Sequence, residues 1–139
     1  MNDVVIDQAL TAAMRERMPL VATLEMEFIS AAPEGVTARM AWAPERCTAN
    51  GILHGGAIMA FADTLGGFLA FFNLPEGAAA TTTIESKTNF FRAIRGGYLY
   101  AQATPLHTGR STIVIDTELT DDAGKRVARV TQTQAVLGG

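Results

Sequence analysis

The segment from Asn50 to Phe72 constrains the fold most, because it is almost wholly apolar and contains a single carboxylate, Asp63. The sequence His54-Gly55-Gly56 comes just before this carboxylate, at the start of the longest apolar run. Burying a carboxylate without a partner costs several kcal/mol. The segment therefore predicts a long core helix, from about residue 54 to 72, whose one acid has either a bonding partner or a chemical task.

The same segment is not expected to cross a membrane. Its charge-free runs on the two sides of Asp63 cover residues 47–62 and 64–75, and glycines interrupt both. A spanning helix uses about 18 or more consecutive apolar residues. A core helix of a folded domain is the better interpretation.

Length and charge narrow the class of protein. A chain of 139 residues fits one domain with a real core, so we expect a single domain over residues 1–139, with residues 1–18 as an N-terminal helical extension. The net charge of −3 and the scattering of the 11 Lys and Arg residues argue against a nucleic-acid surface. A lone cysteine, Cys47, and the lack of a signal-peptide pattern favour the cytoplasm.

The first half of the chain predicts one helix and one hairpin before the core helix. Residues 4–18 have apolar side chains loosely at helical spacing, and Pro19 ends that helix. Residues 20–30 alternate as a strand, residues 32–35 form a turn, and residues 36–44 return as a second strand.

The second half predicts four strands, at residues 80–91, 97–107, 111–120 and 126–137, joined as an antiparallel meander. In the third of these strands Ile113, Ile115 and Leu119 share one face, whereas Thr112, Asp116 and Glu118 share the other. The apolar face needs a cover, and only the core helix is long and apolar enough. The expected fold is α+β, with one long helix wrapped by a curved antiparallel sheet of about six strands.

Several motifs carry a resemblance to a known family. The stretches HGGAIMAFADTLGG, TTTIESKTNFFRAI, GYLYAQATPLHTGRSTIVIDTEL and DDAGKRVARVTQT resemble the hotdog-fold acyl-CoA thioesterases, in the branch of the phenylacetate-pathway and 4-hydroxybenzoyl-CoA enzymes. The strongest element is His-Gly-Gly followed by Asp63 at the spacing found in that family. The resemblance implies a hotdog fold, a homodimer whose sheets join edge to edge, and further pairing into a homotetramer.

The chemistry of a helix start explains the two glycines. Unpaired amides and a partial positive charge at a helix N-terminus can polarise a thioester carbonyl. Because Gly55 has no side chain, the substrate can come close to the backbone there. Asp63 lies about 12 Å further along the same helix, too far to act on a carbonyl held by Gly55. The resemblance implies that Asp63 of one subunit faces the helix start of the other, as general base or as nucleophile.

Other residues are expected to support this site. The resemblance places Thr48 where many relatives have an amide that orients water, and Asn50 is the nearest amide in this chain. Thr82 is expected opposite Asp63, with Thr81 next, and His54 is expected to bind backbone rather than act as a base. Alternatively, Asp63 is a structural acid bonded to threonine hydroxyls.

Substrate contacts are expected at strand ends and along the helix. Residues that fit the phosphates of coenzyme A, or else are ordinary turn charges, are Arg92, His107 and Arg110. Residues expected to line an acyl pocket are Leu65, Phe68, Phe90 and Thr81.

The expected activity is hydrolysis of a medium-chain or aromatic acyl-CoA, with no metal or redox cofactor and with coenzyme A only as part of the substrate. The alternatives are a hotdog protein that binds acyl-CoA or acyl carrier protein without catalysis, and a hotdog hydratase or dehydratase. Cys47 is expected to be inert, because no histidine and acid accompany it in a nucleophile motif.

Overall fold

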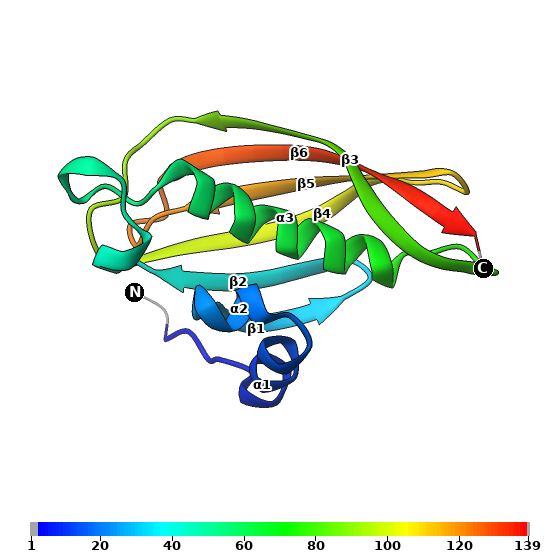
Figure 1. The fold of residues 1–139 in the computed structure, drawn as a ribbon, viewed down its shortest axis with the longest axis horizontal. Helices are drawn as coiled ribbons and strands as arrows, with labels where there is room; N and C mark the ends of the chain where they lie inside the picture. The colour runs from blue at the N-terminus through cyan, green and yellow to red at the C-terminus, as the bar shows by residue number, and fades with distance from the viewer. Residues whose placement is uncertain (1–2, 139) are drawn as a thin grey trace.

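The computed structural model describes residues 3–138, in which a six-stranded sheet curves around one long helix (Figure 1). Two short helices precede the sheet on the N-terminal side. In chain order the helices and strands are α1 (Gln8–Arg17), α2 (Pro19–Thr23), β1 (Glu27–Ala32), β2 (Gly35–Ala41), α3 (Gly55–Phe72), β3 (Ala78–Phe90), β4 (Tyr98–Thr108), β5 (Thr112–Thr120) and β6 (Arg126–Gly138). The expected α+β hotdog architecture is confirmed.

The strand order in the sheet is β1-β2-β4-β5-β6-β3, with every neighbouring pair antiparallel. The predicted hairpin β1–β2 is confirmed, and β4, β5 and β6 form the predicted meander. The prediction that β3 begins this meander is wrong, because β3 pairs with β6 from Ala78 to Phe90 at the far edge. Strand propensity and alternation identify a strand but not its neighbour, which the crossing connection after Phe90 decides here.

Helix α3 packs on the concave face of the sheet, and its core residues are Ile58, Phe61, Ala62, Leu65, Gly66, Leu69 and Ala70. The other side of the helix is more open, since Met59, Asp63, Phe71 and Phe72 are exposed. The predicted core helix is therefore buried on its sheet-facing side and exposed on the other. By length and composition alone α3 could span a membrane, but it packs as the core helix of the sheet.

The start of the chain differs from the prediction. The predicted strand from residue 20 is instead α2, because Pro19 occupies its first turn, where a fixed φ and a missing N–H are tolerated. Glu25, at φ 50°, then turns the chain, and β1 starts at Glu27. The second strand ends at Ala41 rather than at residue 44, because the chain enters a short 3₁₀ turn at Pro44–Arg46.

The two faces of β5 are as the sequence predicted. Ile113, Ile115 and Leu119 are fully buried beneath α3. On the outer face Asp116 is also largely buried, and its Oδ1 accepts hydrogen bonds from Arg129 Nε at 3.0 Å and Thr131 Oγ1 at 3.1 Å. The hydrogen bond to Asp116 raises the pKa of Arg129, so this ion pair stabilises an acid that the polar face would otherwise leave unpaired.

Candidate active site

Asp63 lies on the open side of α3, and its carboxylate is held through one oxygen. Oδ1 accepts a hydrogen bond from Thr83 Oγ1 at 2.9 Å and a second from Gln132 Nε2 at 3.1 Å. Within residues 3–138, Oδ2 accepts no hydrogen bond. The carboxylate is thus oriented on one side and free on the other, which suits a group that must react.

A second glutamine directs the hydroxyl of Thr83 toward Asp63. Gln134 Nε2 donates to Thr83 Oγ1 at 2.7 Å, so the hydroxyl oxygen accepts from behind and donates its proton forward. Both glutamine side chains are almost fully buried, Gln132 at 0% and Gln134 at 1% exposure. Strand β6 therefore supplies two fixed amide donors to a site whose acid comes from α3.

Gly66 makes room for this arrangement. A Cβ at Gly66 would lie 2.6 Å from Nε2 of Gln132 and closer still to the rest of its amide. Gln132 Oε1 is buried without a hydrogen-bond partner among the described residues, so the amide is committed to Asp63 through its nitrogen. A glycine on the buried face of α3 is what allows a long polar side chain to reach the acid.

Three site residues were not predicted from the sequence: Thr83, Gln132 and Gln134. The available signal was in β6, where glutamines occupy positions 132 and 134 on the same face as the buried Ala128 and Val130. Two amides on the core face of a strand require partners, and they point to a polar site beneath the helix. The alternation of β6 alone would have identified them.

The prediction that Thr82 lies opposite Asp63 is wrong by one residue. Thr83 pairs with the inward-facing Gln134, whereas Thr82 pairs with Ala135 on the outer face. Residues directly opposite in an antiparallel pair point to the same side of the sheet. Thr81 points inward with Thr83 but lines a neighbouring pocket and forms no hydrogen bond with Asp63.

The start of α3 has the capped geometry that its sequence suggests. His54 is the N-cap, and its Nδ1 accepts a hydrogen bond from the Gly56 amide at 2.7 Å. A Cβ at Gly56 would lie 2.9 Å from the imidazole, so the second glycine serves this cap. The Gly55 amide has no acceptor within the described part of the chain, and the Phe90 ring packs beside it.

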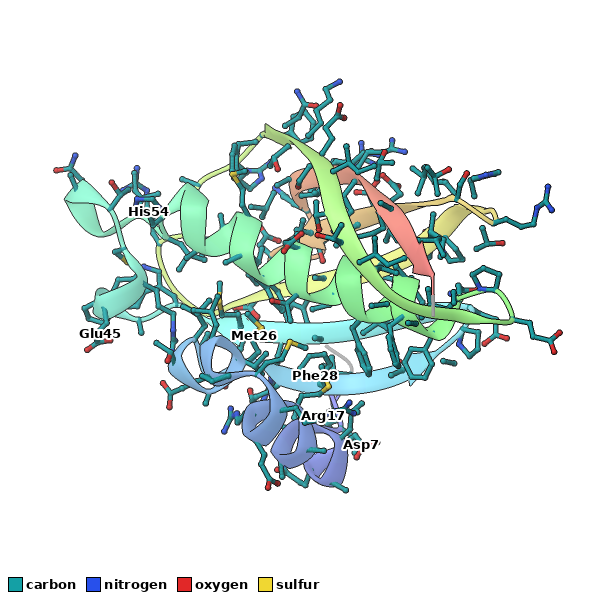
Figure 2. The ribbon with its side chains drawn as sticks, turned by 45° about the vertical axis from the view of Figure 1, so that its right-hand side comes forward. Asp7, Arg17, Met26, Phe28, Glu45 and His54 are labelled. Atoms are coloured by element: carbon teal, nitrogen blue, oxygen red, sulfur yellow. The ribbon has the colours of Figure 1, made fainter. Side chains whose placement is uncertain are left out.

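Thr48 and Asn50 belong to the loop between Glu45 and His54, which leads into the start of α3 (Figure 2). Asn50 has φ 67° and precedes Gly51 at φ 68°, so it fits the role of a turn residue. The Thr48 amide donates to the Ile52 carbonyl at 2.8 Å, closing the turn. Both side chains are exposed, and neither forms a hydrogen bond with Asp63 of its own chain.

The expected acyl-pocket residues do not all gather. The prediction for Leu65 is wrong, because this residue lies on the core face of α3, is fully buried and does not line the cavity beside the helix. Phe68 and Thr81 do line a common cavity of about 750 Å³ beside the second half of α3. Phe90 lies instead at the helix start, next to Gly55.

The cations expected to hold coenzyme A lie at opposite ends of one sheet. Arg92 follows β3, whose last residues lie at the same end of the sheet as the first residues of β4. His107 and Arg110 lie at the opposite end, where β4 finishes (Figure 1). Strand β4 is 11 residues long, which corresponds to a separation of more than about 30 Å. The three side chains are exposed, and a single protomer cannot bring them to one ligand.

No group of three or more His, Cys, Asp or Glu side chains suited to a metal ion occurs within residues 3–138. Cys47 is partly buried, and its thiol donates to the Ala43 carbonyl at 3.3 Å.

Comparison with known proteins finds one matching family and several similar structures. The family described as Thioesterase superfamily matches residues 50–128. A thioesterase of Pseudomonas aeruginosa, PA1618, solved as a mutant, superposes with a TM-score of 0.86 at 27% identity, over 100% of this chain and 96% of that one. A Mycobacterium tuberculosis structure that carries an esterase name has a TM-score of 0.84 at 28% identity, over 88% and 98%.

A further relative is the proofreading thioesterase EntH of Klebsiella pneumoniae, which is 33% identical over 88 residues, 63% of this chain and 64% of that protein. The matched residues 50–128 of the family include the helix start, Asp63 and Thr83. They end just before Gln132 and Gln134, so the two amide donors lie outside the family match.

Proposed function

The chain belongs to the thioesterase superfamily and is a thioester hydrolase, and from this premise we propose that it cleaves a medium-chain or aromatic acyl-coenzyme A with Asp63 as the reacting side chain. The observation that carries the proposal is the asymmetry of the carboxylate. Thr83 and Gln132 hold Oδ1, while Oδ2 is free to meet a water molecule or the thioester.

The reaction requires a donor for the carbonyl oxygen and an acceptor for a proton. The Gly55 amide at the start of α3 supplies the donor, aided by the partial positive charge of the helix end. With Asp63 as general base, Oδ2 takes a proton from water as the water oxygen bonds to the carbonyl carbon. The C–S bond then breaks, and the proton passes to the departing thiolate. If Asp63 is the nucleophile, Oδ2 bonds to the same carbon, the C–S bond breaks and the thiolate leaves. Water then hydrolyses the mixed anhydride, which releases the acid, restores the Asp63 carboxylate and supplies the proton that the thiolate takes up.

Either route requires a second copy of the chain. Eight residues of helix separate Gly55 from Asp63, about 12 Å, so one protomer cannot offer both groups to one carbonyl. A homodimer in which Asp63 of one protomer faces the helix start of the other would bring them together. The free edge of β3 supports this assembly, since the strand has only β6 as a neighbour and exposes Ile84 at 63% and Phe90 at 48%.

The register of such a pairing supports shared sites. Two β3 strands that pair antiparallel about their midpoint, Ile84, would set Phe90 opposite the partner's Ala78. Phe90 packs against Gly55, so the helix start would lie over the half of the partner strand that contains Thr81 and Thr83. The same symmetry would bring Arg92 of one protomer toward the end of the sheet that carries Arg110 of the other. Further pairing into a tetramer and a cytoplasmic location belong to the same proposal.

Thiol release from a panel of acyl-CoA esters tests the proposal. Asp63→Asn keeps the size of the side chain but removes its basicity, so turnover should fall by about 100-fold or more while the fold stays intact. Asp3→Asn makes the same chemical change at an exposed acid away from the site and should leave turnover unchanged. Unchanged hydrolysis by a well-folded Asp63→Asn protein would remove Asp63 from the reaction.

A further inference from the structure

The cavity beside Asp63 has a wall that the family match does not cover. It measures about 750 Å³ and lies between α1, the second half of α3 and the first half of β3. Its lining includes Thr83, the residue that donates to Asp63, so the cavity opens next to the reacting carboxylate. Helix α1 forms the opposite wall and precedes the residues matched by the family, 50–128.

One face of α1 is turned to the cavity. The α1 segment contributes residues at spacings of three and four along the helix, namely Leu10, Ala13, Met14, Arg17 and Met18. The wall contributed by α3 and β3 consists of small, aromatic and hydroxyl residues, and Gln134 of β6 also lines the cavity. Arg17, which Figure 2 labels on α1, is the one charged residue among these lining residues.

Arg17 has no bonding partner in the described part of the chain. Neither an ion pair nor a side-chain hydrogen bond involves its guanidinium within residues 3–138. Its neighbour Arg15 contrasts with it, because Arg15 Nε donates to the Met26 carbonyl at 3.2 Å. The two arginines of the last turn of α1 therefore differ, one tied to the fold and the other free beside an apolar cavity.

From this placement we infer that the cavity binds an acyl group whose far end carries a carboxylate, and that Arg17 recognises that carboxylate. This inference rests on the proposed function, since it identifies the acyl class that the thioesterase site would cleave. An apolar chain suits the walls formed by Met14, Phe68 and Phe72, and a terminal anion suits the guanidinium through a paired, charge-assisted hydrogen bond.

The length of the cavity limits the acyl chain. Its lining along α3 runs to Phe72, nine residues and about 13 Å beyond Asp63. An extended chain advances about 1.2 Å per bond, so roughly ten bonds span this distance. The cavity therefore accommodates half-thioesters of dicarboxylic acids with up to about eleven carbons, the number that ten bonds join.

Matched ester pairs test the inference. Adipoyl-CoA is compared with hexanoyl-CoA, and suberoyl-CoA with octanoyl-CoA, in wild-type protein, Arg17→Gln and Arg17→Glu. In the wild type kcat/KM should favour the carboxylated ester of each pair. Arg17→Gln should lower this preference about tenfold, which corresponds to one charge-assisted hydrogen bond at an exposed site, and Arg17→Glu should reverse it. Lys125→Gln removes one positive charge in the exposed β5–β6 turn, far from the cavity, and should leave the preference unchanged.

The outcomes separate this inference from the proposed function. If the neutral esters are hydrolysed and Arg17→Gln leaves the ratio within each pair unchanged, the inference is wrong and the thioesterase proposal stands. A stability loss in Arg17→Gln without a change in that ratio would assign Arg17 to the helix terminus and would also overturn it. If no ester is hydrolysed, calorimetry measures the binding of two uncleavable thioethers, carboxypentyl-CoA and hexyl-CoA, to the wild type and to Arg17→Gln. Tighter binding of the carboxylated thioether that is lost in Arg17→Gln supports the inference, and equal binding refutes it.

Discussion

At the scale of single residues, two glycines of α3 place polar groups where larger side chains would exclude them. Gly55 leaves an amide open at the helix start, and Gly66 leaves space for the Gln132 amide that holds Asp63. Gly55 therefore provides one hydrogen-bond donor, its own amide, and Gly66 makes room for another, the Gln132 amide. Substitution of either glycine tests that donor without changing Asp63.

Gly55→Pro should abolish the carbonyl donor while keeping the helix. Proline is tolerated at the first helical position, and His54, at φ −64° and ψ 131°, already has the extended conformation that precedes proline. Turnover should fall about 100-fold or more, as for the loss of one oxyanion donor.

Gly55→Ala is the matched control for Gly55→Pro. Both variants add a Cβ about where the Phe90 ring lies, at 3.2 Å, but alanine keeps the N–H. Circular dichroism checks the fold, and thiol release measures turnover. An alanine variant as slow as the proline variant would show that crowding of Phe90, rather than the amide, is responsible.

Gly66→Ala should misplace Asp63 without touching it. The new methyl group would overlap the Gln132 side chain, so Nε2 would leave Oδ1 and only Thr83 would hold the carboxylate. We expect kcat to fall about tenfold or more, with KM nearly unchanged, because a positioning bond is lost and substrate contacts are kept. Gly96→Ala, at an exposed position with open space around its Cβ and outside the cavity beside α3, is the control. Equal kcat values in the two variants would contradict a positioning role for Gln132.

At the scale of elements, the start of α3 allows two roles for His54 to be distinguished, helix capping and acid–base chemistry. Because Nδ1 of His54 accepts from Gly56, the ring acts as the helix cap. Asparagine caps helices as well as any residue, whereas alanine does so poorly. We therefore expect His54→Asn to keep most of the activity and stability, and His54→Ala to lose about 1 kcal/mol of unfolding free energy and part of the turnover.

Denaturant unfolding and thiol release, measured together, check this expectation. Equal, large losses of turnover in both His54 variants, with the stability of His54→Asn intact, would assign acid–base chemistry to the imidazole.

The elements also show how far the sequence can predict this molecule. Helix α3 and the four later strands could be located within two residues, because apolar spacing and β-branched residues mark elements that the core buries. The place of β3 in the sheet could not be predicted, because pairing depends on chain crossing. Thr83 was missed since a one-residue shift along a strand changes the face of every side chain.

At the scale of the whole molecule, an acid and an amide on one helix are too far apart to share a substrate. Dimer formation through β3 can therefore be tested by a substitution on the free edge of this strand. Ile84→Lys should produce monomers that are folded but inactive, because charged residues on an edge strand oppose pairing. Leu106→Lys makes the same change at an exposed site on β4 and should keep both the oligomer and the activity. Light scattering measures the oligomeric state of both variants, and thiol release measures their turnover. An active Ile84→Lys monomer would contradict the shared-site proposal.

Mixing inactive variants tests sharing directly. Asp63→Asn and Gly55→Pro, refolded together in equal amounts, should form hybrids in which one of the two sites has both native groups. Half of the dimers are hybrids, so activity should recover to about a quarter of the wild-type value. No recovery, despite exchange of subunits seen by native mass spectrometry, would show that both groups act within one protomer.

The 13-residue free edge of β3 also has a consequence for the life of the newly made chain. A long edge with unsatisfied backbone groups and an exposed isoleucine is a template for uncontrolled aggregation until something covers it. If a second copy is that cover, then dilution, slow synthesis or a variant that weakens the edge would reduce solubility as well as activity. Selection on β3 would then act on proteostasis, and its sequence would be constrained even at positions distant from the chemistry.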